Sequence, residues 1–349
     1  MIDLAHIDLA HIWAVLIAVA VFLYVALDGF DLGVGILFPF ARDAKQRDQM
    51  VSTIAPVWDG NETWLVLGGG GLFAAFPHAY AALMPALYLP IGVMLTALIF
   101  RGVAFEFRHH GRARGKKFWT AAFAGGSLAA ALAQGFVLGG FIQGSDFFNG
   151  QFIGHPLDWL TPFSVLVAAS LAIGYALLGA TWLIFKAEGD LLERARRWAR
   201  RLAIAVGLAM AGVSLATLAL NPLITERWGI NMMRVDWETF SKVAVLPALA
   251  AALVFFIWRD AGKTAPDASH LRPYLMSVAL FATGYAGLAV SLWPYIVPFS
   301  MTPQDAAAAD NALALMLWGA APMLPIILGY TAYVYWLFRA KVGEHEAYH

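Results

Sequence analysis

The chain has 349 residues, of which 60% are hydrophobic and only 13% are charged. A soluble domain is about half apolar and about a quarter charged, so this composition excludes an ordinary soluble protein and indicates a polytopic membrane protein. The formal net charge of zero gives no reason to expect nucleic-acid binding, and the lack of cysteine excludes disulfides, thiolate metal sites and cysteine-bound iron–sulfur clusters.

Apolar segments long enough to cross a membrane, which takes about 20 helical residues, follow one another along the whole chain. We predict an all-α integral membrane protein with nine transmembrane helices, over residues 12–38, 56–76, 80–105, 118–141, 161–185, 199–221, 240–258, 272–296 and 312–338. No lysine or arginine precedes the first segment, so we expect a retained helix there and not a cleaved signal peptide. No loop is long enough for a soluble domain, so residues 1–349 are expected to form one membrane domain.

The basic residues indicate the topology. Of the 23 lysines and arginines, 20 fall in or next to the loops after the first, third, fifth, seventh and ninth segments. Because cytoplasmic loops carry the excess of Lys and Arg, we expect a periplasmic N-terminus and a cytoplasmic C-terminus. Residues 185–201, FKAEGDLLERARRWARR, are expected to form a cytoplasmic amphipathic stretch with a solvated basic face.

Two acidic residues lie inside the first segment, in the sequence LDGFDLGVG. Asp28 and Asp31 are expected about 15 Å and about 10 Å from its cytoplasmic end, at 1.5 Å per residue. They share a helix face, and Gly29 and Gly33 form a G-x-x-x-G pair that permits close helix contact. A charged side chain near the bilayer centre costs about 2.5 kcal/mol or more, so both acids should face the bundle interior.

More carboxylates follow in the next two segments. Asp59 and Glu62, in APVWDGNETW, lie near the positive end of the second helix dipole and should reach a depth similar to that of the first two acids. Glu106, at the inner end of the third segment, extends the set towards the cytoplasm. The nearest basic residue is Arg101, which we expect at the inner end of the third segment, away from the depth of the acids.

Buried carboxylates without basic partners tend to take up protons, because desolvation and like charges both favour the neutral form. A chain of such groups is what a proton relay needs, so we predict a proton path in the cytoplasmic half of the first three helices. The alternative is that the acids stay protonated and only join helix to helix.

The histidines give little support for haem binding by this chain. None lies in the central part of a predicted segment, whereas haem in membrane bundles usually takes His or Met ligands from facing helices. Methionines such as Met94 and Met276 lie inside segments, but methionine in an apolar helix is usually a packing residue. We therefore predict no metal site and no haem ligand on this chain.

Five stretches, in the same order along essentially the whole chain, resemble subunit II of the bacterial cytochrome bd-type quinol oxidases: LDGFDLGVG, STIAPVWDGNETW, GGGGLFAAFPHAY, FRGVAFEFR and PYIVPFSMT. The likeness is greatest to the cyanide-insensitive branch. It implies a first four-helix bundle over residues 12–141, a second over 161–296, and a peripheral helix over 312–338.

The resemblance also implies a function in the aerobic respiratory chain of a bacterial cytoplasmic membrane. The complex would oxidise quinol and reduce O2 to water with cytoplasmic protons, which makes turnover electrogenic. Two b-type haems and one d-type haem would lie in the partner subunit I, so that this chain carries no haem. It further allows a bound quinone or lipid, contact with membrane lipids, and a small single-helix accessory subunit.

Particular residues match the family's motifs. Asp31 and Asp59 match acids assigned to a proton-entry path, and Trp58 sits beside the second of them. Asp28 matches the first acid of the family's DGFD motif, and Glu62 falls where some members have Gln. The alternatives are a purely structural scaffold and a stand-alone proton-coupled transporter. A transporter often has repeats and a midplane site, whereas these acids lie in one third of the chain with no second cluster.

Overall fold

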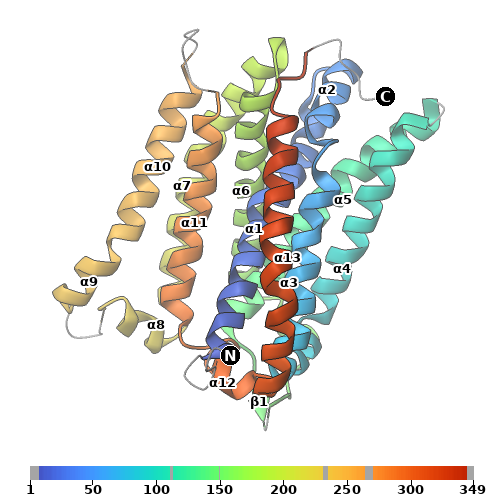
Figure 1. Cartoon of the computed structure of the whole chain (residues 1–349). Helices are drawn as coiled ribbons and strands as arrows, with labels where there is room; N and C mark the ends of the chain where they lie inside the picture. The colour runs from blue at the N-terminus through green and yellow to red at the C-terminus, as the bar shows by residue number, and fades with distance from the viewer. Residues whose placement is uncertain (1–7, 111–112, 149, 231–234, 264–269, 344–349) are drawn as a thin grey trace.

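The computed structural model describes residues 8–110, 113–148, 150–230, 235–263 and 270–343. Long helices run side by side in one bundle, and short helices lie at its two ends (Figure 1). The only strands in the described ranges form a small hairpin, β1 (Phe147–Phe148) and β2 (Gln151–Phe152). The expectation of an all-α architecture is confirmed.

Eight helical stretches of the described chain are long and apolar enough to cross a membrane, and each coincides with a predicted segment. They are α1 (Leu9–Leu37) with the 3-10 turn η2 (Phe38–Phe40), α4 (Pro77–His110), α5 (Ala113–Gln143), α6 (Pro162–Lys186), α7 (Gly189–Leu218), α9 (Trp237–Val243) with α10 (Val245–Ala261), α11 (Arg272–Leu292) and α13 (Asp310–Leu337). Short helices connect them: α2 (Ala44–Ile54), α8 (Pro222–Arg227) and α12 (Pro303–Ala306).

The second predicted segment forms α3 (Trp58–Ala75), an 18-residue helix that is not among these eight. Its first turns are polar, with Asp59, Asn61 and Glu62, and a run of four glycines occupies its middle. It nevertheless packs along α1 and α4. The expected start at Pro56 was wrong, since the helix begins at Trp58, after a turn.

The basic stretch after α6 is part of a long helix. α7 begins at Gly189 and continues without a break to Leu218, where the sequence predicted a separate span from residue 199. The Arg-rich residues 194–201 therefore occupy the first turns of the same helix that crosses the bundle.

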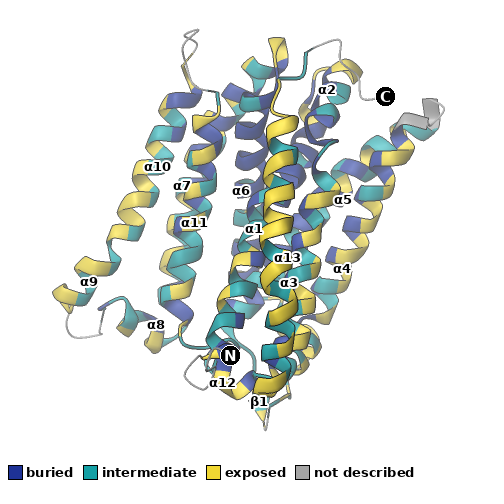
Figure 2. Cartoon of the chain, in the orientation of Figure 1, coloured by how far each residue is buried: buried dark blue, intermediate teal, exposed yellow. Residues whose placement is uncertain are grey.

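The core lies where α1 crosses α6. α6 is the most buried span, with 67% of its most apolar window buried, against 6% in α13, and Figure 2 shows this contrast. A Cβ on Gly33 would lie 1.8 Å from the Tyr175 carbonyl oxygen, and one on Gly179 would lie 2.4 Å from the carbonyl carbon of Gly33. The close contact predicted for the glycine pair is thus observed, because only hydrogen fits at this crossing.

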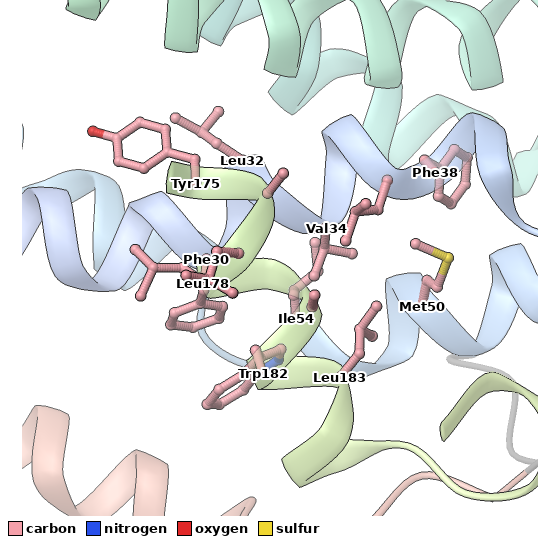
Figure 3. Packing of buried hydrophobic residues seen from close by; sticks show 14 of the residues in the cluster. Phe30, Leu32, Val34, Phe38, Met50, Ile54, Tyr175, Leu178, Trp182 and Leu183 are labelled. Atoms are coloured by element: carbon pink, nitrogen blue, oxygen red, sulfur yellow. The ribbon is translucent and has the colours of Figure 1, made fainter. Parts of the chain in front are cut away.

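Large side chains fill the space on either side of the crossing, as Figure 3 shows for Phe30 and Val34 of α1 beside Leu178 and Trp182 of α6. The rings of Phe30 and Trp182 are stacked with centroids 4.0 Å apart. This packing fixes the inner half of α1, the part that carries the acidic residues, against the most buried helix of the chain.

Candidate functional site

A buried arginine lies among the acidic residues. Arg101 Nη1 is 2.8 Å from Asp28 Oδ1 and 2.8 Å from Glu62 Oε1, and Arg101 Nη2 is 3.9 Å from Asp31 Oδ2. The side chains of Asp28 and Asp31 are fully buried, that of Arg101 is 1% exposed and that of Glu62 is 26% exposed. Both acids of α1 therefore face the interior, as expected.

The expectation that the acids lack a basic partner was wrong. The predicted third segment ended at residue 105, but α4 continues to His110. Arg101 therefore lies about 13 Å from the end of this helix at 1.5 Å per residue. A Cβ on Gly126 would lie 2.9 Å from the Ala97 carbonyl oxygen and 3.2 Å from the Arg101 nitrogen, so this glycine lets α5 pack closely against α4 beside the arginine.

Charge balance in this cluster favours bound protons. One guanidinium faces three carboxyl groups, from Asp28, Asp31 and Glu62. Arg101 can offset one negative charge, and a further buried charge without a partner is strongly unfavourable. Bound protons would neutralise the other carboxyl groups, because burial and like charges favour the neutral form. Among the described side chains, the cluster therefore has more carboxyl groups than basic partners.

Asp31 has a second, neutral partner. The Asn61 amide Nδ2 donates to Asp31 Oδ2 at 2.7 Å and also lies 3.3 Å from the Leu27 carbonyl oxygen. The Tyr335 hydroxyl, from α13, donates to Asn61 Oδ1 at 2.8 Å. Neither Asn61 nor Tyr335 was singled out from the sequence.

A further chain of polar side chains begins beside Asp28. Tyr24 lies one helical turn before Asp28 on α1, close enough to interact with it electrostatically. Gln134 Nε2 donates to the Tyr24 hydroxyl oxygen at 2.6 Å, and the Tyr175 hydroxyl donates to Gln134 Oε1 at 2.7 Å. These three buried groups tie α1, α5 and α6 together next to the cluster.

The other predicted residues lie at the edge of the cluster or outside it. Asp59 is exposed in the first turn of α3, so it is not buried with Asp31, although it interacts electrostatically with Glu62. The Trp58 ring packs on Phe105, with centroids 5.0 Å apart, and against Gly102, the residue after Arg101. Glu106 is exposed on α4.

Several polar atoms of the cluster have no hydrogen-bond partner within the described part of the chain. They are Asp28 Oδ2, Asp31 Oδ1, Arg101 Nε and Arg101 Nη2. Buried polar groups are normally hydrogen-bonded, so this cluster leaves more hydrogen-bonding capacity unused than a buried site usually does.

The described histidines lie at helix ends or in loops. His11 Nδ1 is 2.7 Å from Asp8 Oδ2 at the start of α1, and hydrogen bonds from the His11 backbone and ring hold the pKa of Asp8 at about 2. His78 is the second residue of α4, and His270 precedes α11. Within the described ranges, no group of three or more His, Cys, Asp or Glu is placed to hold a metal ion.

An open apolar groove of about 690 Å³ runs between α4 and α5. Polar atoms are nearly absent from its walls. The lining residues are Tyr88, Leu89, Gly92, Val93, Thr96, Ala97, Phe100, Ala122, Gly125, Gly126 and Ala129.

Known proteins share both the sequence pattern and the fold. The model of the family described as cytochrome bd terminal oxidase subunit II matches residues 9–338. Cytochrome bd-I ubiquinol oxidase subunit 2 of Escherichia coli K12 is 30% identical over 376 residues, covering 97% of this chain and 96% of the relative. Cytochrome bd ubiquinol oxidase subunit 2 of Bacillus subtilis 168 is 28% identical, covering 97% and 98%.

Among solved structures, a chain of the bd oxidase from Geobacillus thermodenitrificans matches with a TM-score of 0.73 at 19% identity, covering 95% of this chain and 99% of that one. The family match covers nearly the whole chain, including the residues of α1, α3 and α4 that carry the arginine and the acids. This chain therefore belongs to the cytochrome bd terminal oxidase subunit II family.

Proposed function

We propose that this chain is the haem-free subunit II of a respiratory quinol oxidase, which supports the haem-bearing subunit I and conducts cytoplasmic protons towards the site of O2 reduction. Family membership makes it a multi-pass inner-membrane subunit of an oxidoreductase that works with a subunit I partner. The observation that supports the proton role is the group of three carboxyls around Arg101, two of which are fully buried.

The proposed path enters at Asp59. This carboxylate is exposed at the start of α3 and interacts electrostatically with Glu62, one turn further along the helix. Glu62 is partly exposed and shares Arg101 Nη1 with the buried Asp28. Exposure thus decreases from Asp59 to Glu62 to the acids of α1, which is the order expected of an entry route from water.

Arg101 would hold the path in place without carrying the proton, because a guanidinium stays charged at any physiological pH. Its fixed positive charge lets one carboxylate remain ionised at a depth where it would otherwise be neutral. Asp28, Asp31 and Glu62 can then exchange protons, each with Arg101 as a common neighbour.

The proposed topology has nine spans, which are the eight apolar helices and, in addition, α3. The N-terminus is periplasmic and the C-terminus is cytoplasmic. α3 lies along α1 and α4 inside the bundle, and a neighbouring chain could shield its polar start from lipid. The start of α1 and the end of α13 lie at opposite ends of the bundle (Figure 1). The division into bundles 12–141 and 161–296 and a peripheral helix 312–338 belongs to the same proposal.

The haem-free assignment rests on the ligands available. The histidines whose side chains the structure describes lie at helix ends or in loops and are paired or exposed: His11, His78, His155 and His270. Haem ligands in bundles, in contrast, project from facing helices. Two b-type haems and one d-type haem would then be held by subunit I.

Mild solubilisation and capture through a C-terminal tag, followed by a reduced-minus-oxidised spectrum and a subunit gel, tests this assignment. Haem b and haem d bands with a second large membrane subunit are expected, and the chain expressed alone should be colourless. A colourless preparation without a partner from native membranes would favour a stand-alone transporter, and haem on the isolated chain would contradict the haem-free assignment.

Replacing the acids tests the proton role. Asp31→Asn and Asp59→Asn should each lower quinol oxidase turnover at least about tenfold at unchanged haem content. In general acid–base catalysis, a positioned side chain that transfers a proton contributes about 10²–10⁴-fold. Asp310→Asn, an exposed acid at the start of α13, is the matched control and should keep full turnover. Full turnover in both test variants would rule the path out.

A further inference from the structure

We propose that Tyr335 of α13 is a positioning residue for Asp31 and that it acts through Asn61. This inference deepens the proposed proton path and rests on it. It assigns a function to the last helix of the chain, which contributes no carboxyl group to the cluster.

The chemistry of the amide makes this arrangement directional. The amide of an Asn side chain has an NH2 group that donates hydrogen bonds and an oxygen that accepts them. Rotating the amide by half a turn exchanges the positions of these two groups. The Tyr335 hydroxyl donates to Asn61 Oδ1 at 2.8 Å, which leaves Nδ2 to donate to Asp31 Oδ2 at 2.7 Å. Without that hydroxyl the amide could turn its oxygen towards the carboxylate, and two acceptors would then face each other.

Tyr335 reaches inwards from a helix that otherwise faces outwards. Leu313 is the single buried residue recorded for α13, and Figure 2 shows most of its length as exposed. The Tyr335 ring meets the edges of Trp182 and Phe30, at centroid distances of 6.1 and 6.4 Å. Two aromatic side chains therefore hold the Tyr335 ring, and its hydroxyl group is placed against Asn61.

The end of α13 is anchored from two other helices. Lys186, at the end of α6 and 4% exposed, donates from Nζ to the carbonyl oxygens of Phe338 and Ala340. Gln49 of α2 donates to the Val342 carbonyl oxygen at 2.9 Å, and the Val342 amide donates to the Lys186 carbonyl oxygen at 2.7 Å. This anchor begins three residues after Tyr335 and fixes where its hydroxyl points.

Other charged and titratable groups also face Asp31. Asp28 lies on the same helix, Arg101 comes from α4, Glu62 from α3, and Tyr274 from α11. None of them touches the amide of Asn61 in the recorded hydrogen bonds of the described residues, so the pair formed by Asn61 and Tyr335 can be varied without removing a charge.

The test uses the intact oxidase complex with Tyr335→Phe, which removes only the hydroxyl. Turnover per haem should fall about fivefold, the factor carried by about one net hydrogen bond. Because a carboxylate that loses a donor holds its proton more tightly, the pH profile of turnover should also move to higher pH. Tyr330→Phe, on the exposed face of the same helix, is the matched control and should change neither quantity.

A double-variant comparison keeps the test independent of folding. Because Tyr335 acts through Asn61, the variant Asn61→Leu combined with Tyr335→Phe should be no slower than Asn61→Leu alone. Independent, multiplying losses would overturn the proposal, as would a wild-type rate and pH profile in Tyr335→Phe or a loss of haem that accounts for the whole effect.

Failure of the proposal and failure of the proton path are distinguishable through Asp31→Asn. Slow turnover in Asp31→Asn with normal turnover in Tyr335→Phe would contradict the positioning role of Tyr335 and leave the proton path intact. Normal turnover in both variants would contradict the proposed proton path through Asp31.

Discussion

At the level of single residues, Arg101 controls the electrostatics of the site. It is 1% exposed and lies within 4 Å of carboxyl oxygens from Asp28, Asp31 and Glu62. A buried ion pair adds little net stability by itself, because desolvation offsets most of the attraction. Removing one partner is different, since it leaves the other charge buried without compensation.

We predict that Arg101→Gln destabilises the chain by about 3–5 kcal/mol, measured as lower thermal stability of the solubilised complex and lower yield. The double variant Arg101→Gln with Asp28→Asn should recover part of the loss, because it removes one stranded carboxylate. Arg42→Gln, which breaks an exposed pair with Asp190 at 3.4 Å, is the control and should cost about 0–1 kcal/mol. Equal losses in both single variants would contradict the buried network.

His270 should make stability depend on pH. Its Nε2 is 3.3 Å from Arg196 Nη2, and burial, with the charges of Lys341 and Arg196, lowers the pKa of His270 below its usual 6.5. The unfolded chain then binds more protons than the folded one just below pH 6.5, so stability is complete above that pH and falls as the pH drops through the folded pKa. The melting temperature should decrease across this window, and His270→Gln should flatten the decrease, whereas His155→Gln, on an exposed loop, should not.

The sequence predicted part of the site at this scale. Asp28 and Asp31 had to face inwards, because lipid exposure of a carboxylate is too costly. The depth of Arg101 was predicted wrongly. The signal was available, because Arg101 lies inside the predicted segment 80–105 and an arginine inside a membrane segment needs an acidic partner. Asn61 and Tyr335 carry no such signal, because a contact across 274 positions depends on how α13 docks.

At the level of elements, the crossing of α1 and α6 fixes the position of the acids. Gly33→Ala would bring a methyl group within 1.8 Å of the Tyr175 carbonyl oxygen, so the two helices would have to separate. Overpacking typically costs about 1–3 kcal/mol and more where backbone is in the way. We expect Gly33→Ala to lose assembled complex and haem signal, measured as the haem-to-protein ratio after capture.

Gly212→Ala in α7 is the matched control for this prediction, since no described atom lies within 4 Å of a Cβ at that position. It should keep the wild-type haem-to-protein ratio, because alanine favours helix over glycine. Normal assembly of Gly33→Ala would show that the crossing tolerates a wider spacing.

Helix positions followed from hydropathy, but helix ends did not. Eight predicted segments coincide with the eight apolar helices of the described chain. α3 begins two residues later than predicted, at Trp58, and α7 begins ten residues earlier than predicted, at Gly189. Neither helix has a side-chain hydrogen bond at its N-cap, so tertiary contacts set those ends, and such contacts are not visible in a hydrophobicity pattern.

At the level of the whole molecule, the buried charged residues are concentrated in a few helices. The buried cluster belongs to α1, α3 and α4, while α10 and α13 present mostly apolar side chains to the outside (Figure 2). On α3, Asp59 is exposed in the first turn, and Gly69 and Gly70 are exposed further along the helix.

The most direct test of the proton path is time-resolved proton uptake when the fully reduced complex reacts with O2, followed with a pH-sensitive dye. Asp31→Asn should slow uptake at least about tenfold at unchanged haem content, while Asp310→Asn should match the wild type. Wild-type uptake rates in Asp31→Asn, with all haems present, would contradict a path through the carboxyl groups around Arg101.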